Sequence, residues 1–284
     1  MDSKVSAIYK ETVQELTSIY DQREAEIMCN LLFEDLLGIS KTDRLIRPDS
    51  MLEADRVGKI NSAVKRLLLH EPIQHIIGHT HFYGRKFKVN KHTLVPRPET
   101  EELVDLIIKE NQKPNLQILD IGTGTGCIPI SLALEMKRPE VHALDISAGA
   151  LAIAKENAQL NQAYVSFSEM DILTEELKEN ELDIIVSNPP YIPDLEKSQM
   201  DRNVLDYDPE IALFVPDQDP LLFYRVIGEK ALKALKAGGK LYFEIHEKYG
   251  KATMELLESQ GYREVSVFQD LQGKDRMVCA IAGT

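Results

Sequence analysis

The sequence contains little cysteine, and its three cysteines, Cys29, Cys127 and Cys279, lie far apart. They form no CxxC pair, so the sequence provides neither a disulfide framework nor a zinc site and suits a reducing compartment. The N-terminal segment lacks the apolar core of a signal peptide, and no uncharged apolar run approaches the ~18 residues of a membrane span. From these absences we expect a soluble, cytoplasmic protein.

Basic residues are also few, with 33 Lys and Arg against 46 Asp and Glu and a formal net charge of −13. Tight nonspecific binding to nucleic acid depends on Lys and Arg that displace counterions from the phosphates. The deficit therefore disfavours duplex nucleic acid as a partner, although it leaves room for a local basic groove. With 284 residues the chain is long enough for about two domains.

The spacing of apolar residues divides the chain into three parts. Residues 1–78 carry them at helical spacing, which predicts a small α-helical bundle. Residues 79–95 contain two short β-type runs around a glycine, which predicts a hairpin linker. In residues 96–284 short apolar strands alternate with helices, the pattern of a doubly wound, mostly parallel sheet.

The expected α/β sheet has seven strands. Five come from the alternating pattern, and a terminal antiparallel hairpin supplies the other two. The strands are predicted at residues 117–121, 141–145, 164–167, 183–187, 240–245, 262–269 and 276–282.

A glycine-rich loop follows the first of these strands. Its residues are Gly122, Thr123, Gly124, Thr125 and Gly126. Glycines let the backbone approach a ligand closely, but the spacing is not the GxGxxG of a dinucleotide site, and Asp120 before the loop would repel a pyrophosphate. Asp145 ends the next strand, where a carboxylate accepts hydrogen bonds from ribose hydroxyls. These features favour S-adenosylmethionine, a cation with one ribose and no phosphate, over a nicotinamide dinucleotide.

A second motif, Asn188-Pro189-Pro190-Tyr191, follows the strand at 183–187. Ligands of such sheets bind beyond the carboxyl ends of the strands, so Asn188 is expected to face the cofactor. The prolines remove two backbone donors, which leaves the carbonyl of Pro189 free beside the side-chain carbonyl of Asn188. Two rigid acceptors suit the NH2 group of a carboxamide or of a nucleic-acid base. Tyr191 is expected to pack flat against that planar group.

Together with Pro96-Arg97-Pro98-Glu99-Thr100-Glu101 and the stretch 72–78, these motifs resemble the HemK/PrmC family. Members of this family methylate a glutamine side chain in peptide-chain release factors. The resemblance covers essentially the whole chain and implies a class I S-adenosylmethionine methyltransferase fold. It further implies a first domain that holds the release factor, methylation of the glutamine in its Gly-Gly-Gln motif, and S-adenosylhomocysteine as the product. The alternative is an amino-methyltransferase that acts on a nucleic-acid base, because Asn-Pro-Pro-Tyr is shared with adenine and guanine methyltransferases.

The resemblance also implies roles for individual residues. The catalytic residues would be Asn188, Pro189 and Tyr191, and Pro190 would join them in receiving the substrate glutamine. The cofactor would be bound by the glycine-rich loop, by Asp145 at its ribose, by Asp171 and Ile172 at its adenine, and by Asn188. We expect a monomer that makes no direct contact with nucleic acid or membrane.

No metal is expected, although four histidines cluster between residues 70 and 81. Pro72 and Gly78 interrupt any single helix that would aim these side chains at one point. The chain departs from the family pattern at His75, where the family often has Tyr, and at His246, which stands in place of a more usual Gly after Glu-Ile.

Overall fold

The structure is a computed structural model that describes residues 3–283. Its contacts divide the chain into two compact units, the first ending at Gly78 and including Asp201–Tyr207, and the second comprising His79–Met200 and the chain from Asp208 onward. The segment Asp201–Tyr207 thus groups with the helical unit, whereas we expect it from the sequence within the domain at 96–284. Across residues 3–283, none of the helices has the length and apolar character needed to cross a bilayer.

The first unit is helical, as predicted, and contains one apolar core. They are α1 (Val5–Leu16), α2 (Gln22–Leu37), α3 (Lys41–Ile46), α4 (Ala54–Leu68), α5 (Ile73–Ile77) and α9 (Arg202–Leu205). The start and end of α2 are visible in the sequence: the side chain of Asp21 accepts a hydrogen bond from the N–H of Glu24, and Gly38 ends the helix with a φ of 61°. The short α3 buries none of its residues and has no apolar period that would predict it.

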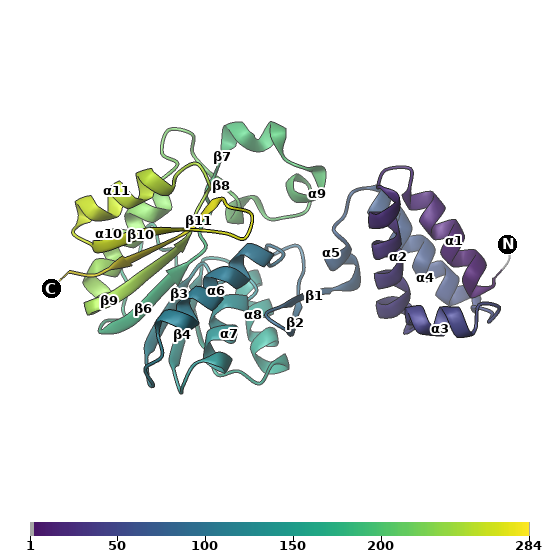
Figure 1. The fold of residues 1–284 in the computed structure, drawn as a ribbon, viewed down its shortest axis with the longest axis horizontal. Helices are drawn as coiled ribbons and strands as arrows, with labels where there is room; N and C mark the ends of the chain where they lie inside the picture. Colours follow the sequence, from purple (N-terminus) through teal and green to yellow (C-terminus); the bar gives the residue numbers. More distant parts are fainter. Residues whose placement is uncertain (1–2, 284) are drawn as a thin grey trace. The chain divides into compact units, whose positions relative to one another are not determined.

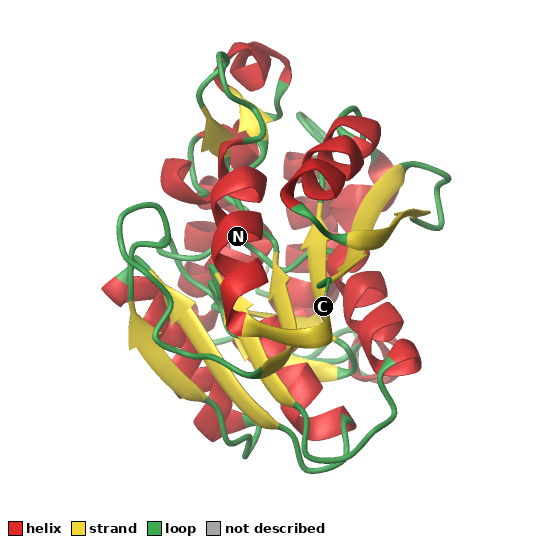
Figure 2. Ribbon diagram, turned by 90° about the vertical axis from the view of Figure 1, so that its left-hand side faces the viewer, coloured by secondary structure: helices red, strands yellow, loops and turns green. Residues whose placement is uncertain are grey.

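A seven-stranded sheet organises the second unit, with the strand order β10-β11-β9-β6-β3-β4-β5. The strands are β3 (Gln117–Ile121), β4 (Glu140–Asp145), β5 (Ser166–Glu169), β6 (Leu182–Ser187), β9 (Leu235–Glu244), β10 (Arg263–Gln269) and β11 (Asp275–Ile281). The pairs from β9 to β5 are parallel, and β11 pairs antiparallel with both β9 and β10. The predicted fold class is therefore confirmed, and Figure 2 shows the strands of this sheet in yellow.

Helices cover both faces of the sheet (Figure 1). The helices α6 (Pro98–Glu110), α7 (Cys127–Glu135) and α8 (Ala148–Leu160) pack on one face, and α10 (Leu222–Ala234) and α11 (Gly250–Gln260) on the other. Each face of the sheet has its own apolar core. Along β6, Ile184 and Val186 lie in the core under α6 and α7, and Ile185 lies in the core under α10 and α11. Because successive side chains of a strand point to opposite faces, a strand between two cores is apolar throughout, and this makes β6 recognisable in the sequence.

Two smaller pairs of strands complete the second unit. The strands β1 (His79–Phe82) and β2 (Arg85–Lys88) form an antiparallel pair around a turn at Tyr83 and Gly84, which both have positive φ. The strand β7 (Ile192–Pro193) pairs with β8 (Phe214–Val215), and the 3-10 helices η1 (Asp194–Gln199) and η2 (Glu210–Ala212) lie beside them in sequence. The strand predicted at 164–167 lies two residues too early. The pairing of β5 with β4 begins at Ser166, and Tyr164 is exposed before it.

Two leucines at the end of α4, Leu67 inside the helix and Leu69 at its C-cap, provide a test of the helical core. Leu67 is fully buried, whereas Leu69 is 67% exposed. We expect Leu67→Ala to lower the free energy of unfolding by about 2–5 kcal/mol, because it leaves a cavity, and Leu69→Ala to change it by less than about 0.5 kcal/mol. Urea denaturation followed by circular dichroism measures both variants. Equal losses in the two variants would contradict the burial described for Leu67.

Candidate active site

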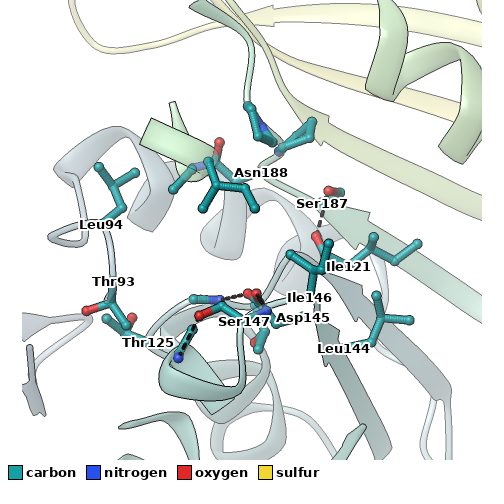
Figure 3. Close-up of a pocket in the computed structure, with 18 of the residues that line it drawn as sticks. Thr93, Leu94, Ile121, Thr125, Leu144, Asp145, Ile146, Ser147, Ser187 and Asn188 are labelled. Atoms are coloured by element: carbon teal, nitrogen blue, oxygen red, sulfur yellow. Dashed lines mark hydrogen bonds between the residues drawn. The ribbon is translucent and has the colours of Figure 1, made fainter. Parts of the chain in front are cut away.

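A pocket of about 230 Å³ lies in the second unit at the carboxyl ends of β3, β4 and β6. In the strand order, β3 stands between β4 on one side and β6 on the other, so the chain reverses its winding direction at β3. Ligands of doubly wound sheets bind at such a point because the loops on either side diverge and leave a crevice. Figure 3 shows Asn188 on one side of this pocket and Asp145 and Ser147 on another.

The glycine-rich loop is held against β4 by its own backbone. The N–H groups of Gly122 and Thr123 donate to the carbonyl of Leu144 at 2.9 and 3.0 Å. Gly126 has a φ of 78°, and a Cβ there would lie 3.0 Å from Cδ1 of Ile130 and 3.2 Å from Cβ of Ala154. Gly126 therefore permits close packing at the start of α7, and it is absent from the pocket lining that the other four loop residues share.

Asp145 connects the loop to the end of β4. It is 9% exposed and lines the pocket. One carboxylate oxygen accepts a hydrogen bond from the N–H of Gly124 at 2.8 Å, and the other accepts one from the N–H of Ser147 at 2.8 Å. Burial raises the pKa of Asp145, while these backbone donors act in the opposite direction. Each oxygen keeps a further lone pair, which fits the predicted binding of two ribose hydroxyls.

Asp120 is a second buried carboxylate, at the end of β3 just before the loop. It is 0% exposed, and neither of its side-chain oxygens has a hydrogen-bond partner among the described residues. Burial raises its pKa to about 7. A nearby positive charge would stabilise the ionised form, so an unpartnered carboxylate at this loop fits a cationic cofactor such as S-adenosylmethionine.

The residues predicted at the adenine also reach the pocket. Asp171 and Ile172 both line it. Ile172 is 7% exposed and offers an apolar surface, as expected. The carboxylate of Asp171 accepts hydrogen bonds from the N–H of Leu173 and the hydroxyl of Thr174, both at 2.9 Å, so it stabilises the turn that carries Ile172.

The segment after β6 brings the predicted substrate residues to the same pocket. Asn188, Pro189 and Pro190 line it. The hydroxyl of Ser187 donates to the carbonyl of Ile121 at 2.6 Å and so ties the end of β6 to the end of β3. Tyr191 is absent from the lining, and its hydroxyl donates to Glu244 at 3.2 Å. Its expected contact with the acceptor group therefore stays a prediction.

One wall of the pocket comes from residues to which the sequence assigns no binding role. It is formed by the segment before α6, and its lining residues there are His92, Thr93, Leu94, Pro96 and Arg97. A guanidinium nitrogen of Arg97 lies 3.6 Å from the carboxylate of Asp208, a residue whose pKa burial raises to about 6. The motif at 96–101 is a signal for this wall, but its spacing alone does not show that the wall faces Asn188.

The two residues that depart from the family pattern lie in different surroundings. Nε2 of His246 lies 3.2 Å from a carboxylate oxygen of Glu196, and its Nδ1 accepts a hydrogen bond from the N–H of Lys248 at 3.1 Å. His75 is partly buried in the first unit, where burial lowers its pKa. Over residues 3–283 there is no group of three or more His, Cys, Asp or Glu side chains that could hold a metal ion.

Comparison with known proteins gives matches to both units. Residues 100–205 match the family model described as the methyltransferase small domain, and residues 7–78 match the PrmC N-terminal domain. The release factor glutamine methyltransferase of Flavobacterium psychrophilum is 47% identical over 94% of this chain and 95% of its own length. The corresponding protein of Bacteroides thetaiotaomicron is 46% identical over 94% of this chain and 96% of its own.

A solved structure agrees with the fold. A methyltransferase from Pyrococcus furiosus superposes with a TM-score of 0.53 at 17% identity, and the match covers 82% of this chain and 100% of that one. At this level of identity the likeness shows the fold alone.

The role predicted for Asp145 is tested by Asp145→Asn. An amide in this place loses the charge and one acceptor, so the affinity for S-adenosylhomocysteine should fall by about 10- to 100-fold, the range for hydrogen bonds to charged groups. Titration calorimetry measures the dissociation constant. Glu169→Gln is the matched control, because Glu169 pairs with Asp145 on the neighbouring strand but is exposed outside the pocket lining. If both variants bind like the parent, Asp145 does not hold the ribose.

The raised pKa of Asp120 predicts a pH-dependent stability. Between its ordinary value of 3.8 and about 7 the folded state binds the proton more tightly than the unfolded state. This group's contribution to the free energy of unfolding therefore falls as the pH rises through that range. The side-chain amide introduced by Asp120→Asn does not titrate. The free energy of unfolding of the variant minus that of the parent should therefore be larger at pH 8 than at pH 5. Urea denaturation without cofactor measures this difference, and a difference of the opposite sign would refute the raised pKa.

Proposed function

Because the chain belongs to the family of release factor glutamine methyltransferases, we propose that it methylates a glutamine side-chain amide in a peptide-chain release factor. The chain is an S-adenosylmethionine-dependent methyltransferase, with the fold and the methyltransferase domain of this class. Relatives 46–47% identical over 94% of the chain support the acceptor. The observation that carries the proposal is the position of Asn188, which lines the same pocket as Asp145 and the glycine-rich loop.

The acceptor nitrogen of a carboxamide is a poor nucleophile, because its lone pair is delocalised into the carbonyl group. The side-chain carbonyl of Asn188 and the backbone carbonyl of Pro189 are suited to accept its two N–H bonds. Held in this way, the nitrogen is oriented toward the pocket, and orientation of this kind contributes about 7–11 kcal/mol to lowering a barrier. S-adenosylmethionine supplies an activated methyl group on its sulfonium.

The same two acceptors act during the transfer. Positive charge develops on the nitrogen as its bond to the methyl carbon forms, and fixed carbonyl dipoles stabilise that charge. The proton leaves the nitrogen after the new bond has formed, so no general base has to remove it beforehand. Asn188 and Pro189 are therefore the catalytic residues of this proposal, and Pro190 keeps the segment rigid.

The first unit completes the proposal as the part that holds the release factor. It matches the PrmC N-terminal domain. The net charge of −13 favours association with a basic surface over association with phosphates. The predicted monomeric state and cytoplasmic location remain part of this proposal.

The direct test is incubation with S-adenosylmethionine and a recombinant release factor, followed by mass spectrometry of the peptide that contains the Gly-Gly-Gln motif. A mass increase of one methyl group on that glutamine is expected. Methyl groups that appear in added nucleic acid and not in the factor would instead support the base-methylating alternative.

Asn188→Ala tests the catalytic assignment in the same assay. Removal of one of the two acceptors should lower kcat by about 100- to 1000-fold, as for the loss of one hydrogen bond that stabilises developing charge. Asn180→Ala is the matched control, because Asn180 is an exposed residue outside the pocket. A variant at position 188 with the parent's kcat would show that Asn188 takes no part in the reaction.

A further inference from the structure

A buried carboxylate lies behind Asn188 and Tyr191. Glu244 is the last residue of β9, the neighbour of β6, and is 1% exposed. One of its oxygens lies 2.6 Å from the hydroxyl of Thr100, and the other lies 3.2 Å from the hydroxyl of Tyr191. Burial raises the pKa of Glu244, and the hydrogen bonds from Thr100 and Tyr191 act in the opposite direction. In its ionised form this carboxylate only accepts hydrogen bonds, so both hydroxyls donate to it.

Thr100 connects Glu244 to Asn188 through hydrogen bonds. It lies in the first turn of α6, is 3% exposed and lines the pocket. A threonine hydroxyl has a single proton, and Thr100 gives it to Glu244, so its oxygen can only accept a further hydrogen bond. The partner in that position is the side-chain nitrogen of Asn188, at 3.4 Å.

This arrangement decides which way the amide of Asn188 points. If the amide were turned round, its oxygen would face the lone pairs of the Thr100 oxygen, and two acceptors would lie in contact without a proton between them. With its nitrogen toward Thr100, the side-chain oxygen of Asn188 is left for another donor. The proposed hydrogen bond from the glutamine NH2 group to Asn188 depends on that oxygen.

We propose that Thr100 and Glu244 are positioning residues that fix the amide of Asn188 with its oxygen toward the acceptor NH2 group. The inference rests on the proposed function for its catalytic consequence. Its structural part rests only on the hydrogen bonds from Asn188 through Thr100 to Glu244, which we call the relay. Tyr191 donates to the second oxygen of Glu244, so its hydroxyl supports the relay from the other side.

Loss of the Thr100 hydroxyl leaves the amide free to turn. In the turned orientation the NH2 group of Asn188 faces the NH2 group of the glutamine, and two donors repel each other. Productive orientation is then lost without any change at Asp145 or at the glycine-rich loop. The relay therefore predicts a fall in kcat with an unchanged cofactor affinity.

The test compares Thr100→Val with Thr100→Ser in the release-factor assay. Valine keeps the shape but lacks the hydroxyl, and kcat should fall by about 10- to 100-fold, while serine should keep kcat within a few-fold of the parent. Both should bind S-adenosylhomocysteine as the parent does. Thr253→Val is the matched control, since Thr253 is fully buried in α11 and its hydroxyl has no hydrogen-bond partner among the described residues.

Glu244→Gln supplies a second variant at the other end of the relay. Glutamine keeps the size of glutamate but adds a donor, which can point at Thr100 and reverse the direction of both hydrogen bonds. A fall in kcat is expected here too, with cofactor affinity unchanged. If Thr100→Val and Glu244→Gln both keep the kcat of an active parent, the relay has no part in positioning, although the proposed function stands.

A spectroscopic measurement tests the relay without any substrate. The side-chain NH2 signals of Asn188 in a 15N-labelled protein are identified by their loss in Asn188→Ala. Thr100→Val should move the signal of the hydrogen-bonded NH2 proton upfield. Thr100→Ser and Thr253→Val should leave its chemical shift nearly unchanged. An unmoved signal in Thr100→Val would overturn the relay. A parent that methylates no release factor would refute the proposed function, and the NH2 signals would still decide the relay.

Discussion

The position of β3 between β4 and β6 is the constraint on which the whole site depends. Because these strands are parallel, their carboxyl ends meet at one edge of the sheet, and each end is tied to β3 by hydrogen bonds. The loop after β3 donates to Leu144 and Asp145, and the carbonyl of Ile121 accepts from Ser187. The glycine-rich loop and the Asn188 segment are thus parts of one hydrogen-bonded edge.

Two buried carboxylates at this edge illustrate opposite uses of the same side chain. Glu244 accepts hydrogen bonds from two hydroxyls and so fixes the direction in which each hydroxyl points its proton. Asp120 has no partner among the described residues, and its burial raises its pKa. An unpaired buried carboxylate is costly to ionise, and a positive charge brought close reduces that cost. The apolar interior makes one carboxylate a fixed acceptor and leaves the other without a hydrogen-bond partner among the described residues.

Local sequence patterns predicted much of this architecture. The bounds of β3 follow from its apolar run and the glycine after it, and β6 is apolar throughout because both of its faces are buried. At the edge of the sheet this logic was less reliable. The β-type residues at 164 and 165 suggested a strand, but β5 has only β4 as a partner, and the register of that pair sets its first residue at Ser166. The short α3 has no period to detect because it buries nothing.

The sequence by itself determined the fold class and the cofactor class, and it brought the glycine-rich loop, Asp145 and Asn188 to attention, since each depends on a short pattern at the end of one strand. The tertiary structure decided which atoms of those residues are free to act. The hydrogen bond between Thr100 and Asn188 joins residues 88 positions apart, and the one between Thr100 and Glu244 joins residues 144 positions apart. Contacts over such separations arise from strand order and helix packing, which no local pattern specifies. The direction of the Asn188 amide is therefore set by the tertiary structure, which places Thr100 beside it and Glu244 beside Thr100.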